Sequence, residues 1–178
     1  LVGNEYEGRF YPTFSGVAQS YNFYPVGHQK SEEGIANIAV GLGKTVVGGE
    51  KSLRFSPKYP ENIPEFSSLD LILENSQKEL YVLDTSKIDF KLSEKEDITL
   101  KKINVDDIKN DGSLDNIASS YDMSDRIIRE NLSEESPVII TFNGILKYGF
   151  FPLPALLQDI LEIGQKGMGC PIQIEFAV

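Results

Sequence analysis

Short apolar runs, each bounded by glycine, proline or polar residues, constrain the fold of this chain most strongly. Residues 14–21 (FSGVAQSY) and 35–40 (IANIAV) are two such runs. Runs of this length between turn residues predict β-strands. Four glycines then crowd residues 41–49, and residues 52–56 (SLRFS) predict a further strand that ends at Pro57. We therefore expect a sheet with glycine-rich loops in the first third of the chain.

The middle of the chain combines one predicted helix with two predicted strands. A serine at the start and apolar residues at helical spacing predict a short helix over residues 67–77 (SSLDLILENSQ). Alternating residues predict strands at 81–86 and 98–105, joined by a solvated connection at 91–97 (KLSEKED). Residues 106–125 are polar and rich in turn-forming residues.

The last section gives the clearest pattern. Residues 138–142 (VIITF) predict a buried, β-branched strand, and residues 153–165 (LPALLQDILEIGQ) repeat apolar residues at the spacing of a helix. Prolines at its start and glycines beyond its end support this helix. Residues 172–178 (IQIEFAV) predict a closing strand. Strands dominate and helices lie between some of them, so we expect the α+β class.

Composition restricts the possible partners of this chain. It has 178 residues, a net charge of −10 and a pI near 4.6. Nucleic-acid binding requires clustered Lys and Arg, so we expect no nucleic-acid partner. No run approaches the roughly 18 apolar residues of a membrane span, and no signal-peptide pattern is present. The single cysteine, Cys170, fits a reducing compartment, and we predict a cytoplasmic protein without a membrane partner.

Residues 41–45 (GLGKT) resemble the end of a phosphate-binding P-loop, but the full pattern is not met. A P-loop has a glycine five residues before its second glycine, and Ile38 stands at that position. The residues that follow, VVGGEKS, disfavour the helix whose N-terminus would bind phosphate. A P-loop kinase is therefore disfavoured.

Three sequence blocks, in order along the chain, resemble the ATP-binding region of the phosphoenolpyruvate synthase and pyruvate phosphate dikinase family. Residues 14–25 (FSGVAQSYNFYP) resemble the family's SGVAFT strand and the NP turn after it. Residues 41–49 (GLGKTVVGG) resemble its GLGE-VV-G segment, and residues 168–178 (MGCPIQIEFAV) resemble its G-x-P-x-DIEFA strand. With weaker stretches between these blocks, the resemblance extends over most of the chain.

This resemblance implies an ATP-grasp-like lobe, with a mostly antiparallel mixed sheet and flanking helices, that binds ATP and Mg²⁺. We expect residues 1–178 to form one such PEP/pyruvate-binding lobe, as a fragment of a longer chain, with residues 61–137 as a family-variant elaboration. The complete protein would be an ATP-dependent phosphotransferase that passes phosphate through a histidine on another domain to pyruvate or a similar acceptor. Its partners would be ATP and the first lobe and phosphohistidine domain of the same polypeptide. The isolated fragment would be inactive.

The resemblance also implies residues for the nucleotide site. Leu1 and Val2 match a hinge that touches adenine, and Gly41 and Gly43 match the glycine segment of the nucleotide pocket. Glu175 is the expected magnesium ligand, because a carboxylate binds a hard cation that bridges phosphate oxygens. The alternative is that Glu175 faces solvent on an alternating strand.

Other positions leave the chemistry open. Lys44 replaces the family's Glu and either contacts a phosphate or marks altered ligand handling. Arg54 either faces the phosphates or lies on the surface, and Gln173 replaces a possible second carboxylate. These departures motivate an alternative function, a non-catalytic nucleotide-binding or regulatory domain with a degenerate ATP-grasp site. The single histidine, His28, lacks the sequence context of the family's phosphohistidine loop, and we interpret it as a turn residue.

Overall fold

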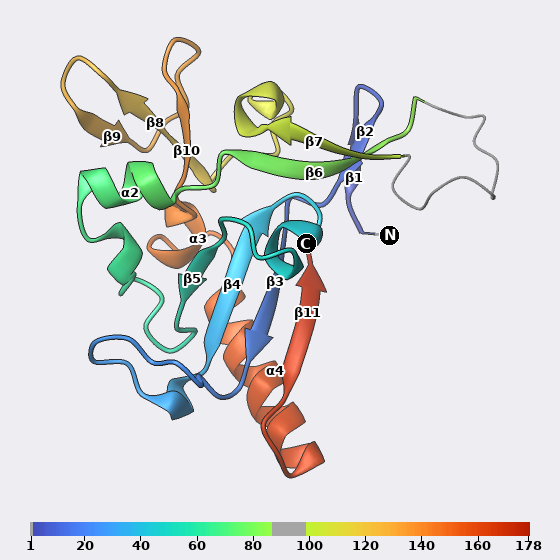
Figure 1. Ribbon diagram of the computed structural model, residues 1–178, viewed down its shortest axis with the longest axis vertical. Coiled ribbons are helices and arrows are strands. Elements are labelled where there is room, and N and C mark those ends of the chain that lie inside the picture. The colour runs from blue at the N-terminus through green and yellow to red at the C-terminus, as the bar shows by residue number, and fades with distance from the viewer. Residues whose placement is uncertain (1, 87–98) are drawn as a thin grey trace.

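The computed structural model describes residues 2–86 and 99–178 of the chain. The described residues form an α+β structure in which all paired strands are antiparallel (Figure 1). The strands are β1 (Asn4–Tyr6), β2 (Arg9–Tyr11), β3 (Phe14–Gln19), β4 (Ile35–Val40), β5 (Leu53–Phe55), β6 (Glu79–Asp84), β7 (Leu100–Asn104), β8 (Ala118–Asp122), β9 (Ile127–Arg129), β10 (Val138–Ile140) and β11 (Gln173–Ala177). The α-helices are α1 (Lys44–Val47), α2 (Leu69–Asn75), α3 (Asn143–Leu146) and α4 (Leu153–Met168), and the 3₁₀ turns are η1 (Ser31–Glu33), η2 (Pro64–Phe66) and η3 (Val105–Ile108).

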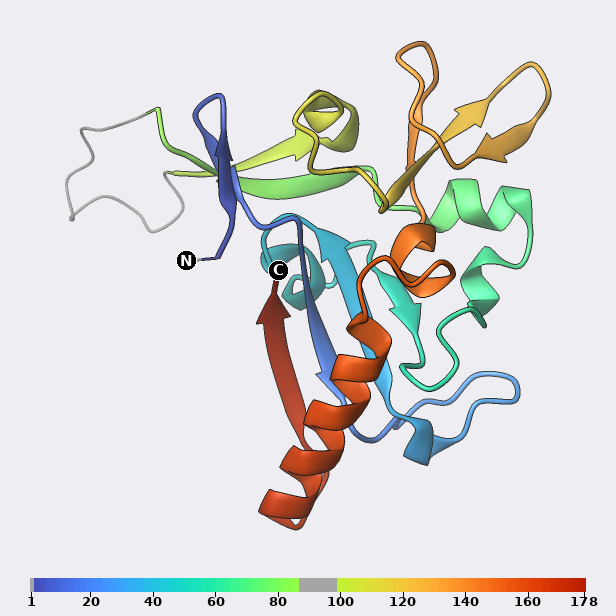
Figure 2. The same cartoon turned by 180° about the vertical axis from the view of Figure 1, so that it is seen from behind.

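Four strands form what we call the central sheet, in the order β11-β3-β4-β5. The last described strand, β11, thus pairs with the third, which joins segments far apart in the sequence in one sheet. Helix α4 lies along one face of this sheet, as Figure 2 shows from behind. It buries Leu153, Leu157 and Leu161, which recur at the spacing of one helix face. The face turned toward the viewer in Figure 1 is therefore the one opposite α4.

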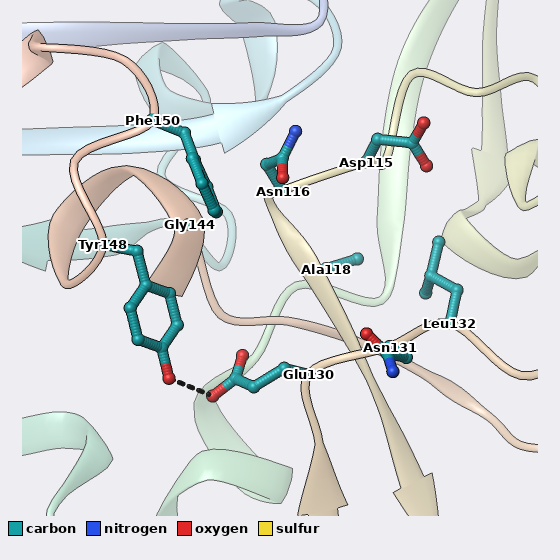
Figure 3. A pocket seen from close by; sticks show the side chains of 9 residues that line it. All are labelled: Asp115, Asn116, Ala118, Glu130, Asn131, Leu132, Gly144, Tyr148 and Phe150. Carbon is teal, nitrogen blue, oxygen red and sulfur yellow. Dashed lines mark hydrogen bonds between the residues drawn. The ribbon is translucent and has the colours of Figure 1, made fainter.

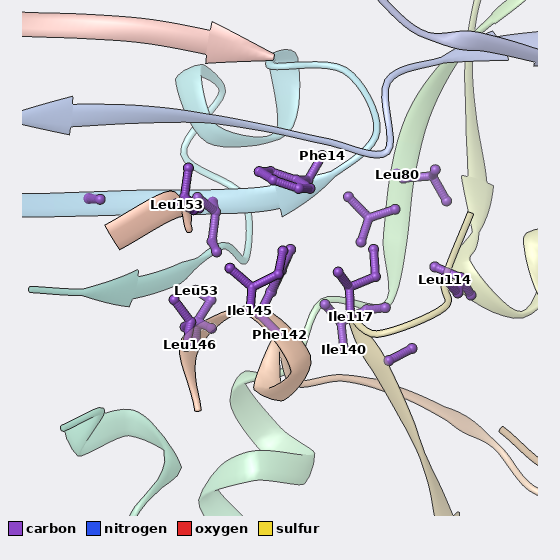
Figure 4. Packing of buried hydrophobic residues seen from close by; sticks show 14 of the residues in the cluster. Phe14, Leu53, Leu80, Leu114, Ile117, Ile140, Phe142, Ile145, Leu146 and Leu153 are labelled. Atoms are coloured by element: carbon purple, nitrogen blue, oxygen red, sulfur yellow. The ribbon is translucent and has the colours of Figure 1, made fainter. Parts of the chain in front are cut away.

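The other two sheets lie toward one end of the central sheet (Figure 1). One has the strand order β1-β2-β6-β7 and the other has the order β10-β8-β9. All three sheets contribute to one hydrophobic cluster, in which Phe14, Leu80 and Ile140 are buried together with the α3 residues Ile145 and Leu146 (Figure 4). The described part of residues 61–137 thus shares the core of the central sheet.

Most of the expected strands and helices are confirmed. The strands expected at 14–21, 35–40, 52–56, 81–86, 98–105, 138–142 and 172–178 correspond to β3, β4, β5, β6, β7, β10 and β11. The Ser68 side chain caps α2 by accepting a hydrogen bond from the Leu71 N–H at 3.3 Å. Gly169, in the left-handed conformation, ends α4 by donating to the Gln165 carbonyl at 2.9 Å. The connection expected at 91–97 lies outside the described residues.

Two expectations were wrong. The sequence after GLGKT was expected to disfavour a helix, yet Lys44–Val47 forms the single turn α1. Tertiary packing overrides weak propensity here, because Thr45 is buried and α1 contacts both β3 and β4. In the turn-rich stretch 106–125, residues Ala118–Asp122 form β8, whose first three residues are buried. Pairing with both β10 and β9 offsets the low strand propensity of its serines.

Among the described helices, none is long and apolar enough to cross a membrane. The cytoplasmic location stays a prediction.

Candidate functional site

A row of four residues crosses the central sheet on the face opposite α4. Glu175 on β11 pairs with Val17 on β3, Val17 pairs with Asn37 on β4, and Asn37 pairs with Arg54 on β5. Directly paired residues of antiparallel strands lie on the same face, so these four side chains share one face. The neighbouring positions Ile174, Ala18, Ala36 and Phe55 point to the α4 side and join the hydrophobic core. One face of the sheet is therefore apolar, and the other carries three polar side chains. We call the four residues Glu175, Val17, Asn37 and Arg54 the polar row, although Val17 is apolar.

The polar row is accessible to a ligand. Glu175 is exposed, and Val17, Asn37 and Arg54 are each partly exposed. Strands are spaced about 4.8 Å apart, so the backbones of Glu175 and Arg54 lie about 14 Å apart across the sheet. They cannot contact one atom together, but one extended ligand can span the row.

The glycine segment 41–49 closes one end of this face. Gly41 follows β4 with φ +84°, and a side chain there would meet the Tyr81 carbonyl oxygen at 2.9 Å. The Ser15 hydroxyl donates to the Gly41 carbonyl at 2.7 Å, and the Leu42 N–H donates to the Tyr81 carbonyl at 3.0 Å. The packing of this segment against β6 thus requires glycine at position 41, independently of any ligand.

Two of the predicted site residues come together at this end. Gly43 and Glu175 both line a pocket of about 320 Å³, with Ser15, Val17 and Val47 among the other lining residues. A side chain at Gly43 would lie 3.8 Å from the Ser15 hydroxyl, so glycine is not required there by packing. The absence of a side chain leaves space between α1 and Glu175.

The lining of this pocket supplies one carboxylate as a possible magnesium ligand. Among the described residues, no group of three or more His, Cys, Asp or Glu side chains could hold a metal ion. Glu175 is the only carboxylate in the pocket lining. Mg²⁺ is commonly bound through one or two carboxylates together with phosphate oxygens and water. The donor set therefore fits Mg²⁺ that arrives with a phosphate ligand, and does not form a complete metal cage.

Lys44 lies at the start of α1 and faces the sheet β1-β2-β6-β7. Its ammonium is 5.4 Å from the centre of the Tyr81 ring, and the Lys102 ammonium is 5.7 Å from the same centre. The Tyr81 hydroxyl donates to Glu50 at 2.7 Å, and Lys102 forms an ion pair with Glu50 at 3.0 Å. Hydrogen bonds from Tyr81 and Lys102 lower the pKa of Glu50, and the same bond to Glu50 raises the pKa of Tyr81. Lys44, in the glycine segment, therefore lies next to the charged cluster formed by Tyr81, Glu50 and Lys102.

Arg54 is used to hold a loop. Its guanidinium donates to the Asn22 side-chain oxygen at 3.1 Å and to the Tyr24 carbonyl at 2.7 Å. Asn22 is buried, and its oxygen also accepts from the Tyr24 N–H at 3.1 Å. Arg54 thus anchors the loop after β3 at the far end of the polar row from Glu175.

The remaining predicted residues are placed as follows. Val2 is exposed and precedes β1, while Leu1 lies outside the described residues. The Gln173 side chain, on the same face of β11 as Glu175, accepts a hydrogen bond from Gln19 at 2.7 Å. His28 lies in a turn and lines a different pocket, together with Tyr59 and Asn62.

Sequence reasoning missed Asn37, which completes the polar row. The signal was present, because Asn37 is the single polar residue in the apolar strand IANIAV. Its alignment with Glu175 and Arg54 depends on strand register, which the sequence alone did not give. The Tyr81–Glu50–Lys102 cluster was also missed, because its members come from three separate segments.

Compared with protein-family models, with curated proteins and with solved structures, the chain finds no match. The functional assignment therefore depends on the geometry of the central sheet and on the sequence resemblance.

Proposed function

We propose that this chain is the ATP-binding lobe of a phosphotransferase that resembles phosphoenolpyruvate synthase and pyruvate phosphate dikinase. The observation that carries the proposal is the polar row from Glu175 to Arg54 on the accessible face of an antiparallel sheet. Helix α4 covers the opposite face of this sheet, and the glycine segment closes one end of the row. An ATP-grasp lobe of the expected kind binds nucleotide against such a sheet face.

In this proposal, Glu175 holds Mg²⁺ together with phosphate oxygens, and Gly43 leaves room for them beside α1. The bound magnesium neutralises phosphate charge. Lys44 begins α1, which borders the same pocket, although its ammonium lies over the Tyr81 ring, and Arg54 fixes the loop that borders the other end of the row. Leu1 and Val2 remain the residues proposed to contact adenine. The whole protein would pass phosphate from ATP through a histidine on another domain to pyruvate or a similar acceptor, with a first lobe completing the site.

Calorimetric titration of the protein with ATP and Mg²⁺ tests this proposal. We expect saturable binding that requires Mg²⁺, and Glu175→Gln should weaken it at least about tenfold because the metal loses its protein carboxylate. Gln173→Asp is the matched variant on the same strand face, and it should strengthen binding by adding a second carboxylate. Absence of ATP binding to the wild type, or equal affinity in Glu175→Gln, would overturn the proposal.

A second candidate function is a non-catalytic nucleotide-binding or regulatory domain with a degenerate ATP-grasp site. It is favoured by Arg54, which donates to the 22–24 loop, and by Gln173, which pairs with Gln19 where the family has a carboxylate. The two functions differ in phosphate release. If the full-length protein binds MgATP but neither hydrolyses it nor transfers its phosphate to histidine, the regulatory function is correct.

A further inference from the structure

Another pocket lies beside α3 and β8 and shares no lining residue with the polar row. It has a volume of about 720 Å³, and Glu130, Tyr148 and Phe150 line it together with Asn116 (Figure 3). Pockets of roughly 300–1,000 Å³ are the usual size for small ligands. None of the residues of the proposed nucleotide site lines this pocket, so its ligand is a separate question.

The Glu130 carboxylate is held in the pocket by neutral donors. One oxygen accepts from Asn143 at 3.1 Å and from Tyr148 at 3.4 Å, and the other accepts from Ser119 at 3.3 Å. Within the described ranges 2–86 and 99–178, no ion pair joins Glu130 to a lysine or arginine. The carboxylate is therefore oriented by neutral hydrogen-bond donors, and among the described residues no ion pair neutralises its negative charge.

Two aromatic rings stand beside this carboxylate. The Tyr148 and Phe150 rings have centres 6.2 Å apart and planes inclined at 46°, and both side chains are exposed. Figure 3 shows both rings on one side of the pocket, with the Tyr148 hydroxyl pointing at Glu130. Ring faces attract organic cations, and a nearby carboxylate adds a direct attraction between opposite charges.

Backbone hydrogen bonds tie the segment that carries both rings to α3. The Tyr148 N–H donates to the Asn143 carbonyl at 3.0 Å, and the Phe150 N–H donates to the Gly144 carbonyl at 2.9 Å. Gly144 in turn packs so closely on Asn116 that a side chain would lie 2.0 Å from its carbonyl oxygen. The backbone that carries the rings is therefore in place before any ligand arrives, which reduces part of the entropic cost of binding.

The hydrogen bonds to Glu130 also select among cations. They occupy much of the acceptor capacity of the carboxylate, whereas a guanidinium needs two free acceptors in its plane. A quaternary ammonium group has no N–H donor and is recognised through charge and ring faces alone. We propose that this pocket binds a small quaternary ammonium compound, with its methyl groups against Tyr148 and Phe150 and its charge toward Glu130.

One cation is already present at the Tyr148 ring. The Lys147 ammonium lies 5.2 Å from the centre of that ring. Lys147 would compete with the ligand for the ring or repel its charge. Lys147→Met should therefore strengthen ligand binding, which is an effect that a purely structural role of this residue would not produce.

Choline is the probe for this proposal, and 3,3-dimethyl-1-butanol is its neutral isostere. Two-dimensional amide NMR of the full chain should show saturable shifts around residues 143–150 with choline, and at least about fivefold weaker binding of the isostere. Glu130→Gln and Phe150→Leu should each weaken choline binding roughly twofold to thirtyfold. Phe23→Leu, which changes an equally exposed ring in another loop, should leave the affinity unchanged.

Any one of three results would overturn the proposal. The first is the absence of choline-dependent shifts, and the second is equal affinity for the neutral isostere. The third is wild-type affinity in both Glu130→Gln and Phe150→Leu. Thermal unfolding of each variant identifies any loss of fold, and Phe150→Leu keeps the test valid if Glu130→Gln does not fold. Co-sedimentation with phosphatidylcholine vesicles identifies the source of the ligand: sedimentation that choline abolishes supports a lipid headgroup, and choline binding without sedimentation supports a free compound.

Discussion

Glu175 and Arg54 occupy opposite ends of one cross-strand row, although they are separated by 121 positions in the sequence, 175 minus 54. Their local environments differ. Glu175 lines a pocket next to the glycine segment, whereas Arg54 donates hydrogen bonds to the loop after β3. The two ends of the row thus differ: an exposed carboxylate lies at one end, and an anchored loop lies at the other.

Asn37 in the middle of this row should contribute to nucleotide binding. Its side chain is partly exposed and forms no hydrogen bond with any described residue, so it is available to a ligand. Asn37→Leu should weaken MgATP binding about fivefold, the equivalent of about 1 kcal/mol for one hydrogen bond. Calorimetry measures this change, and Asn62→Leu, outside the row, is the control. Equal affinities for the two variants would exclude the centre of the row from the binding surface.

Gly16 on β3 should be intolerant of any side chain. A Cβ atom there would lie 2.5 Å from the Asn37 carbonyl oxygen and 2.6 Å from the Phe176 ring. Gly16→Ala should lower the free energy of unfolding by about 1–3 kcal/mol through overpacking. Gly167→Ala in α4 is the matched control, because no atom lies within 4 Å of its added methyl group. That control should raise stability by about 0.5–1 kcal/mol, and urea unfolding measures both changes.

Asn22 should be the main stabilising residue of the loop after β3. Its buried oxygen accepts from Arg54 and from the Tyr24 N–H, each at 3.1 Å. Asn22→Ala leaves both donors without this partner, and we expect a loss of about 1–3 kcal/mol in unfolding free energy. Asn62→Ala, at an exposed position, should change stability by less than about 0.5 kcal/mol. A loss of similar size in both variants would contradict the assigned function of Asn22.

Stability at low pH should depend on Asp84. The hydrogen-bonded ion pair with Lys101 at 2.6 Å, assisted by Ser86, lowers the pKa of the Asp84 carboxyl to about 2. A lowered pKa in the folded state gives stability that is present above the unfolded value, near 3.9, and is lost as the pH falls to about 2. Thermal unfolding between pH 5 and about 2 should therefore be less pH-dependent in Asp84→Asn. Lys101→Gln should have a similar effect, and additive effects in the double variant would show that the two residues act independently.

The sequence predicted strands well where apolar residues formed short, bounded runs. The run IANIAV became β4 because its side chains are almost all buried, so burial and β propensity favoured the same structure. Helix α4 was equally clear, since Leu153, Leu157 and Leu161 repeat along one face and Gly169 ends it. In these segments, local pattern and tertiary packing agree.

Prediction failed where long-range pairing decided the structure. The serines of β8 do not favour a strand, but Ser119 is buried against Thr141 with a hydroxyl–hydroxyl distance of 2.9 Å. The helix α1 forms although glycine and β-branched residues disfavour it, because Thr45 is packed inside. The pocket of about 720 Å³ was not predicted either, since Glu130 and Phe150 come to line one pocket only through the tertiary structure.

The sequence by itself determined the α+β class and the positions of most strands and of α4, because these depend on local periodicity and on glycine and proline. The resemblance of its sequence blocks to a known family also singled out Glu175 and the glycine segment as candidates. Only the tertiary structure decided that Gly43 and Glu175 line one pocket and that Arg54 anchors a loop. Strand register sets which residues share a row, and register depends on the packing of the whole sheet against α4.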